Sequence, residues 1–327
     1  MGMAAGHLTG GALDAGQASP MVSRLLAGRT LRRIRERRGL SREDAGQAIG
    51  IPGPEIIRLE EGRSGFMMRD VVGLCALYGV GDQTERVMLL ELARWGNSPE
   101  WWHPYRDVIP PWFEQYLGLE QAASVIRCYE AQFIPGLLQI PGYARAVFAL
   151  GHRNAPQREI ERRLELRMRR QDILHRPEPA HLWAVIDEAA LRRPIGGAQV
   201  MRAQLRHLIA ASDMPHVTIQ VVPFRLGGHP AIGGPVTVLR LPERQLPDMA
   251  YLEQLTSARY YCDQPSEPEY YRHTLDLLAI QAGRAGHPGA ILSQILNGTE
   301  YRQAAPPPAP RPPREERQGA SPRSPHH

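Results

Sequence analysis

The spacing of apolar residues predicts five short helices between residues 21 and 96. In the first helix, Ala27, Leu31 and Ile34 recur on one face. In the fourth helix, Val71 and Leu74 begin a run with the same spacing. A glycine follows each of the first four helices, at Gly39, Gly50, Gly62 and Gly79, where a left-handed residue commonly ends a helix.

Capping signals support these helix starts. Ser41 and Asp44 have the spacing of a capping box before the second helix. Pro54 lies in the first turn of the third helix, where its missing N–H is not needed. Asp82 and Glu85 predict a second capping box before the fifth helix.

Strand-like and helix-like segments are mixed in the rest of the chain. The predicted strands are Ala123–Tyr129, Leu182–Ile186, Val217–Val222, Val236–Leu241 and Met249–Leu252. The predicted helices are Gln157–Leu174, Gln199–Ser212, Pro268–Ala282 and Ala290–Leu296. The sequence therefore predicts an α-helical N-terminal domain of five helices, followed by an α+β C-terminal domain with a mixed sheet.

Composition sets the domain boundaries. Residues 1–20 contain few large apolar side chains. Residues 304–327 contain eight prolines and no large apolar side chain. We therefore expect both segments to be disordered. Prolines in residues 97–111 are expected to interrupt any helix, and several large aromatic rings lie there. We therefore predict a helical domain at 21–96, a junction at 97–111 and an α+β domain at 112–303.

The basic residues of this chain are unevenly placed. All 39 are arginine, and the formal net charge is +5. Seven arginines and a single acid, Glu36, lie between Arg24 and Arg38, and such a cluster can contact phosphates. The three cysteines lack metal-ligand or redox spacing. No signal peptide or membrane span is apparent, so we expect a cytoplasmic protein without metal or cofactor.

The N-terminal segment resembles the helix-turn-helix of the phage repressor-like (xenobiotic-response-element) family. The matching residues are Gly39-Leu40-Ser41, Ile49-Gly50-Ile51, Ile56, Arg58-Leu59-Glu60 and Gly62-Arg63. The resemblance implies a sequence-specific transcription regulator that binds double-stranded DNA, with the third helix in the major groove, and we expect a homodimer. The residues expected to face DNA are Arg32, Arg42, Gly53, Pro54, Glu55, Ile57, Arg58 and Arg63.

The third helix departs from the family pattern. Polar residues are usual at the positions of Pro52, Gly53, Pro54 and Ile57, and proline and glycine offer no side-chain hydrogen bond to a base. Its acidic residues would repel phosphate unless they face away. These departures bear on direct base recognition more than on DNA binding itself.

The C-terminal part resembles a regulatory domain found behind this type of helix-turn-helix in actinomycete regulators. The matching residues are Trp101-Trp102, Ile134-Pro135-Gly136-Leu137-Leu138-Gln139, Tyr143-Ala144-Arg145, Arg167, Arg170-Gln171, Asp187-Glu188, Leu191, Gln204-Leu205, Val221-Val222-Pro223-Phe224 and the stretch from Gly227 to Pro235. The resemblance implies an antitoxin-like role and a small partner protein encoded nearby.

Two prolines, Pro135 and Pro141, restrict a short segment of the C-terminal domain that we expect to line its regulatory site. The candidate ligand- or partner-binding residues are Leu137, Leu138, Gln139, Tyr143, Arg167, Arg170 and Gln171. The alternative is that the two leucines are plain core and that the arginines are solvated or paired with Glu161 and Glu165.

The sequence leaves the task of the C-terminal domain open. It is either a small-molecule sensor with an enclosed pocket or a docking domain with an exposed apolar groove. A docking module with only weak DNA binding is the alternative for the whole chain. An enzyme is not expected, because phosphate-binding and hydrolase motifs are missing. Asp187 and Glu188 are expected on opposite faces of a strand, and His229 in a surface loop.

Overall fold

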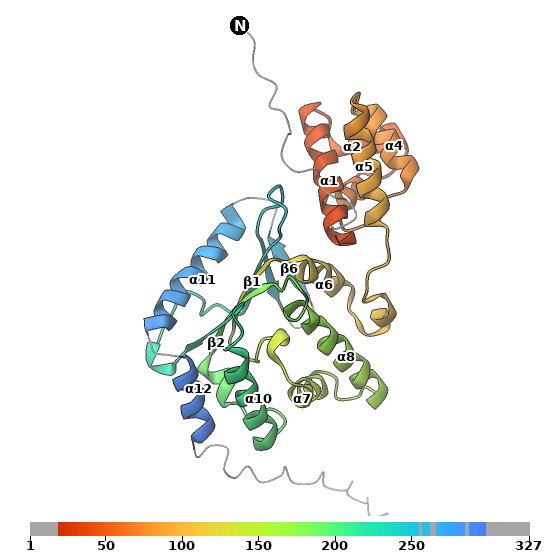
Figure 1. Cartoon of the computed structure of the whole chain (residues 1–327). Helices are drawn as coiled ribbons and strands as arrows, with labels where there is room; N and C mark the ends of the chain where they lie inside the picture. Colours follow the sequence, from red (N-terminus) through yellow and green to blue (C-terminus); the bar gives the residue numbers. More distant parts are fainter. Residues whose placement is uncertain (1–18, 255–256, 262–265, 285–287, 299–327) are drawn as a thin grey trace, which may run out of the picture.

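The computed structural model describes residues 19–254, 257–261, 266–284 and 288–298 (Figure 1). A helical domain is followed by an α+β domain, as the sequence predicts. The predicted tail at 304–327 and nearly all of the predicted leader at 1–20 lie outside the described residues. Only the end of that leader is described, and there Pro20 already begins the first helix after Ser19 caps it.

The five predicted N-terminal helices are present. They are α1 (Pro20–Arg37), α2 (Arg42–Ile49), α3 (Gly53–Glu60), α4 (Met68–Leu77) and α5 (Gln83–Gly96). The capping box of Ser41 and Asp44 forms at α2. The second predicted box is only half formed. Asp82 caps α5 by accepting from the Thr84 N–H, but the Glu85 carboxylate lies 3.8 Å from the guanidinium of Arg33 instead.

The junction is more helical than its prolines suggest. A 3-10 helix, η1 (His103–Val108), lies within it, and α6 (Pro111–Ala122) begins at its last residue. Pro111 occupies the first turn of α6, where proline favours helix initiation rather than preventing it. The aromatic rings do pack, and Trp102 is buried.

The C-terminal domain contains a mixed six-stranded sheet in the order β3-β2-β1-β4-β5-β6. Its strands are β1 (Val125–Glu130), β2 (His181–Asp187), β3 (Val217–Val222), β4 (Val236–Arg240), β5 (Met249–Glu253) and β6 (Ala258–Tyr261). The first three strands are parallel, and β4, β5 and β6 continue the sheet antiparallel. Five strands were predicted, and the short edge strand β6 was missed.

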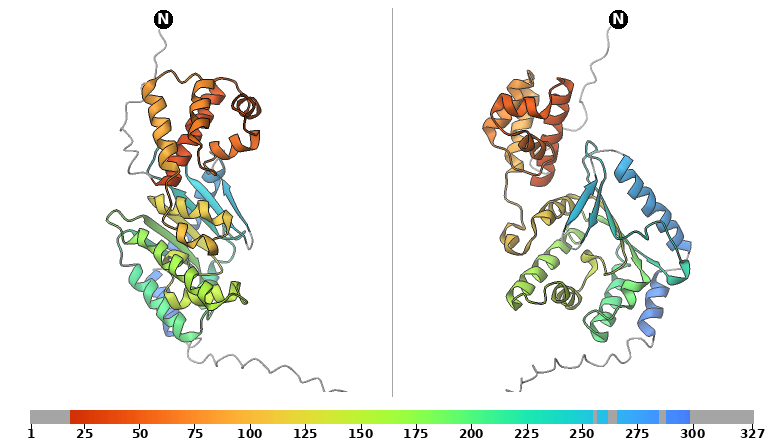
Figure 2. Two further views of the ribbon diagram at one scale, coloured as in Figure 1. Left: turned by 90° about the vertical axis from the view of Figure 1, so that its right-hand side faces the viewer. Right: turned by 180° about the vertical axis from the view of Figure 1, so that it is seen from behind.

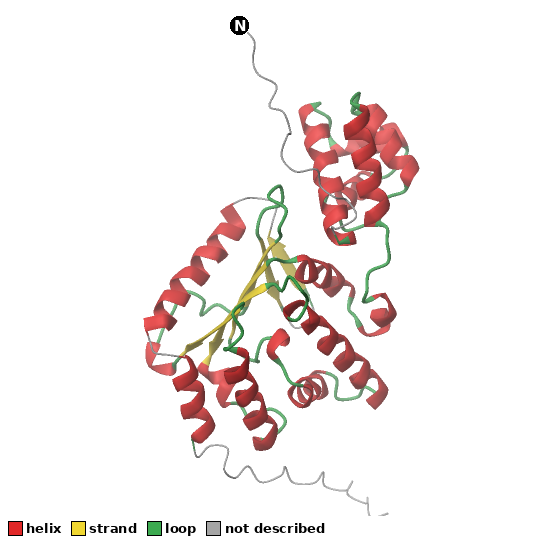
Figure 3. Ribbon diagram, viewed as in Figure 1, coloured by secondary structure: helices red, strands yellow, loops and turns green. Residues whose placement is uncertain are grey.

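Helices cover both faces of this sheet (Figures 2 and 3). One face packs on α11 (Ser266–Arg284) through an apolar cluster that includes Val185 and Leu278. The other face carries α6, α7 (Pro141–Gly151) and α8 (Gln157–Arg170). The chain also forms η2 (Gly136–Leu138), η3 (Gln171–Leu174), α9 (Glu188–Arg192), α10 (Ala198–Ala211), η4 (Phe224–Leu226) and α12 (Pro288–Asn297).

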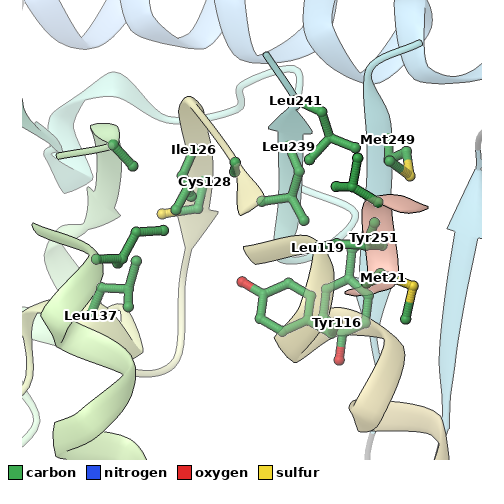
Figure 4. Close-up of a cluster of buried hydrophobic side chains, with 14 of the residues drawn as sticks. Met21, Tyr116, Leu119, Ile126, Cys128, Leu137, Leu239, Leu241, Met249 and Tyr251 are labelled. Carbon is green, nitrogen blue, oxygen red and sulfur yellow. The ribbon is translucent and has the colours of Figure 1, made fainter. Parts of the chain in front are cut away.

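The two domains meet where the start of α1 lies against α6. A Cβ atom on Gly118 would lie 2.7 Å from Cβ of Met21, so only glycine permits this approach. Figure 4 shows Met21 beside Leu119 and Tyr116 in one buried cluster. Nearby, Arg24 of α1 ties the end of α5 and the junction together, because it donates to the Gly96 carbonyl at 2.7 Å and to Glu100 at 3.1 Å. The helical domain is therefore packed directly on a helix of the α+β domain.

Candidate DNA interface and ligand cavity

The outer face of α3 is accessible. Pro54 and Arg58 are exposed, and Gly53, Glu55 and Ile57 are partly exposed. The inward positions of this helix, Ile56 and Leu59, are buried in the apolar core. The residues expected to face DNA on this helix therefore lie on its solvent side.

A buried ion cluster fixes α3 against the two helices before it. Glu60, whose side chain is 2% exposed, accepts hydrogen bonds from Arg35 of α1 at 2.5 and 3.0 Å. It also accepts from Nε of Arg42 on α2 at 2.9 Å. Breaking such a buried pair typically costs about 3–5 kcal/mol, because a charge is left without its partner. Arg42 therefore has a structural contact as well as its predicted place near the DNA backbone.

The acidic residues on and just after α3 are buried or paired in the structure, which reduces their repulsion of phosphate. Glu60 faces inward, Glu55 forms an ion pair with Arg58, and Glu61 lies 3.1 Å from Arg63. The side chains of Arg58 and Arg63 nevertheless remain more than half exposed. Both guanidinium groups can exchange these surface contacts for phosphate or base contacts. Arg32, on α1, pairs with Glu36 at 2.8 Å.

A cavity of about 520 Å³ lies in the α+β domain between the sheet and the helices α6 and α8. Its polar and charged lining includes Glu120, Glu130, Thr237, Gln139, Arg167, Arg170 and Glu253. Its apolar lining includes Phe113, Tyr116, Ile126, Leu137, Val147 and Tyr251. Figure 4 shows Tyr116 and Tyr251 together, from α6 and β5, and their ring centroids are 4.2 Å apart. The cavity has the size and the mixed lining typical of small-molecule sites.

A buried ion pair forms one wall of this cavity. Arg170 of α8 donates to both carboxylate oxygens of Glu120 on α6, each at 2.8 Å. Both side chains are almost fully buried. The Arg170 guanidinium also lies over the rings of Phe113 and Tyr116, 5.1 and 5.6 Å from their centroids. This pair therefore fixes α6 to α8 in a single arrangement.

Arg167 lines the same cavity, but in the described part of the chain its charge has no carboxylate partner like the one that Arg170 has. Its Nη1 donates to Oε1 of Gln139 at 2.9 Å, and its guanidinium lies 4.9 Å from the centroid of the Phe148 ring. Within the described residues, no carboxylate lies within 4.0 Å of it. Burial and the nearby Arg170 lower the pKa of Arg167 to about 10. The side chain remains cationic at neutral pH.

Two carboxyl groups face Arg167 from the sheet. Burial, with the charge of Glu253, raises the pKa of Glu130 to about 8. Glu130 has no hydrogen bond or ion pair to any other described residue. Glu253 lies on the exposed rim and accepts a hydrogen bond from the Tyr251 hydroxyl at 3.0 Å. The cavity thus holds unpaired groups of both signs.

The comparisons with known proteins match both domains. Residues 26–88 match a family described as a helix-turn-helix domain. Residues 113–287, more than half of the chain, match a family described as a domain of unknown function (DUF5753). The chain belongs to the DUF5753 family. No curated protein and no solved structure matches it. The helix-turn-helix match supports a DNA-binding regulator, as the sequence predicts.

The structure brings four of the predicted site residues of the DUF5753 domain to the cavity. Leu137, Gln139, Arg167 and Arg170 all line it. Their ion pairs differ from the alternative drawn from the sequence, because Arg170 pairs with Glu120 rather than with an acid of its own helix.

The other three predicted residues lie behind the lining and hold its backbone. The Tyr143 hydroxyl accepts from the Ile134 N–H at 3.2 Å, and Leu138 is buried in the core. Gln171 donates to the carbonyls of Gly136 and Gln139 at 3.1 and 2.7 Å. These contacts hold the backbone of the segment, and among its predicted residues Leu137 and Gln139 line the cavity.

Sequence reasoning missed half of the cavity. Tyr116 and Glu120 were overlooked because no helix was predicted between the junction at 97–111 and the strand that begins at Ala123. Glu130 had a readable signal, since alternation along β1 places it on the same face as Ile126 and Cys128. Glu253 had no comparable local signal.

Of the expectations for Asp187, Glu188 and His229, the strand position of Glu188 and the exposure of His229 were wrong. Asp187 ends β2 and caps α9, so Glu188 begins a helix rather than continuing the strand. His229 lies in a loop, yet its side chain is 5% exposed. Its Nε2 lies 3.2 Å from the Tyr129 hydroxyl, which donates to Asp187 at 3.3 Å. This group packs the loop onto the ends of the strands.

Among the described residues, no three His, Cys, Asp or Glu side chains are grouped to hold a metal ion. None of the described helices is long and apolar enough to span a membrane.

The pKa of Glu130 predicts a pH-dependent stability. Because the folded-state pKa is raised above the usual value near 4.5, the native state favours the protonated form. Its stabilising contribution is complete below that usual value and is lost as pH rises towards 8. Replacing Glu130 with Gln removes this loss, so E130Q should become more stable than the wild type by about 1 kcal/mol or more at pH 9. Denaturant unfolding of both proteins at pH 5, 7 and 9 measures this difference, and parallel pH curves would contradict it.

Proposed function

We propose that this protein is a sequence-specific transcription regulator whose DUF5753 domain senses a small molecule in the cavity. The outward face of α3, with exposed Arg58 and acids that are already paired, supports DNA recognition. Direct base contacts would come from Glu55, Ile57 and Arg58, with Arg42 and Arg63 near phosphates.

The observation that carries the sensor role is the double contact made by α6. One side of this helix lines the cavity with Phe113, Tyr116 and Glu120. Gly118, on the same helix, meets Met21 at the start of α1. A ligand that moves α6 and α8 together, with their ion pair intact, would therefore shift α1 of the helix-turn-helix domain. Small changes at one site become effective when the elements between two sites are rigid and packed.

A docking role for a small partner protein encoded nearby, in an antitoxin-like system, is the second candidate. It is favoured by Tyr270, Leu277 and Ile280, which are exposed on α11, away from the cavity. Exposed apolar groups of this kind mark protein contacts when they form a continuous patch. The cavity, with its converging charged groups, favours the sensor role more strongly.

The DNA-binding proposal predicts that Arg58→Ala weakens operator binding about tenfold, because one charge-assisted contact is lost. The salt dependence of binding should become shallower by about one counterion. Fluorescence anisotropy with a duplex from the promoter region of its own gene, at 50–200 mM salt as usual for such titrations, measures both. Arg145→Ala is the matched control, because Arg145 is a paired surface arginine of the other domain. Equal affinities for wild type and R58A, or no binding by the wild type at low salt, would overturn the assignment.

We further propose that the protein binds its operator as a homodimer, because one module of this size recognises few base pairs and two-fold proteins fit inverted half-sites. Light scattering of the complex should give the mass of the DNA duplex plus twice the 36.5 kDa chain mass. A single chain per DNA duplex at saturating protein would contradict the dimer.

A further inference from the structure

The unpaired charges in the cavity constrain the ligand, and this inference rests on the sensor function proposed above. Arg167 and Glu130 carry opposite charges when both are ionised, and both line the cavity. They do not pair with each other, since no ion pair within 4.0 Å joins any described carboxylate to Arg167. A half-buried guanidinium and a half-buried carboxyl held apart in one cavity leave room for a molecule between them.

The Arg167 end suits an anion. Gln139 accepts one hydrogen bond from Nη1 and leaves the other N–H groups of the guanidinium for another acceptor. A Cβ on Gly136 would lie 2.8 Å from Nη1 of Arg167, so glycine gives the guanidinium space against the backbone. The guanidinium fork matches the two oxygens of a carboxylate.

The opposite end suits a cation. Glu130 is the last residue of β1 and Glu253 is the last residue of β5, with β4 between the two strands, and both carboxyl groups line the cavity. The negative charge of Glu253 contributes to the raised pKa of Glu130, as expected for two carboxylates without a cation between them. An ammonium group placed there would pair with both and return Glu130 to its ionised form.

The two ends of the cavity differ in charge, so a zwitterion fits the lining better than a simple anion does. The charges of Glu120 and Arg170 cancel each other in their ion pair. Arg167 is then balanced by Glu253, because the raised pKa of Glu130 keeps that carboxyl largely protonated at neutral pH until a cation arrives. A ligand with a single negative charge would gain at Arg167 but would be repelled at the other end.

We propose that the cavity binds a small zwitterion that carries a carboxylate and a primary ammonium, such as an amino acid or a dipeptide. Its carboxylate binds Arg167, and its ammonium lies between Glu130 and Glu253. The volume of about 520 Å³ is adequate for a molecule of this size. Its side chain would contact the aromatic wall of Phe113, Tyr116 and Tyr251.

Binding should also release a proton near neutral pH. The charged or titratable groups around Glu130 are Glu253 and Tyr251 from β5, Arg167 and Arg170 from α8, and Glu120 and Tyr116 from α6. Of these, Glu130 is the carboxyl whose pKa lies near 8, so an incoming ammonium expels its proton. The binding enthalpy at pH 7 should therefore differ between phosphate and Tris buffers, and this difference should vanish in Glu130→Gln.

The test begins with thermal shift of the full chain against the twenty standard amino acids and their glycyl dipeptides. The binder with the largest shift is then titrated calorimetrically beside two analogues, one without the ammonium and one without the carboxylate. We expect each analogue to bind at least tenfold more weakly than the parent. In Arg167→Gln, the parent ligand and the analogue without the carboxylate should bind with equal affinity. In Glu130→Gln, the parent and the analogue without the ammonium should bind with equal affinity. Circular dichroism confirms the fold of each variant, and Arg167→Lys is the charge-conserving control.

Three results would overturn the zwitterion. They are the absence of any shift across the panel, an ammonium-free analogue that binds as tightly as its parent, and binding that both variants leave unchanged. Failure of the sensor function is separable from these results. A zwitterion that binds with both dependences, yet leaves operator affinity unchanged, would keep the ligand class and remove the regulatory role.

Discussion

The buried ion pair between Glu120 and Arg170 is the contact on which the proposed site depends. Two hydrogen bonds of 2.8 Å join α6 to α8, and both groups are shielded from water. Because an unpaired charge in this position is strongly unfavourable, the two helices have one acceptable arrangement. That arrangement sets the width of the cavity and places the aromatic rings of Phe113 and Tyr116 on its wall.

The same pair determines where the DNA-binding domain rests. The chain between Glu120 and Gly118 is less than one helical turn, so fixing one fixes the other. Gly118 receives Met21, and α1 in turn holds α3 through the Arg35–Glu60 ion pair. A continuous line of packed contacts thus runs from the cavity through α6 and α1 to α3. Such a line supports coupling between the two sites.

Local signals explain which features the sequence predicts. Caps and glycines delimit α1 to α5, and helical spacing places Arg167 and Arg170 on the inner side of α8. The missed elements depend on distant partners or on ambiguous residues. Proline can either end a helix or begin one. Pro111 begins α6, so a prediction that treats proline only as a helix breaker misses this helix. Glu120 lies fifty residues from Arg170, and no local pattern reports a contact at that separation.

Hydrogen–deuterium exchange in Arg170→Lys tests the central claim most directly. Lysine keeps the charge but loses the paired hydrogen bonds to Glu120. If the pair positions α6 and α6 positions α1, amides of both helices should exchange faster than in the wild type. Amides of α11, on the opposite face of the sheet, should be unchanged. Faster exchange confined to α6 and α8, with α1 protected as in the wild type, would contradict the claim that the cavity and the DNA-binding domain are joined through α6.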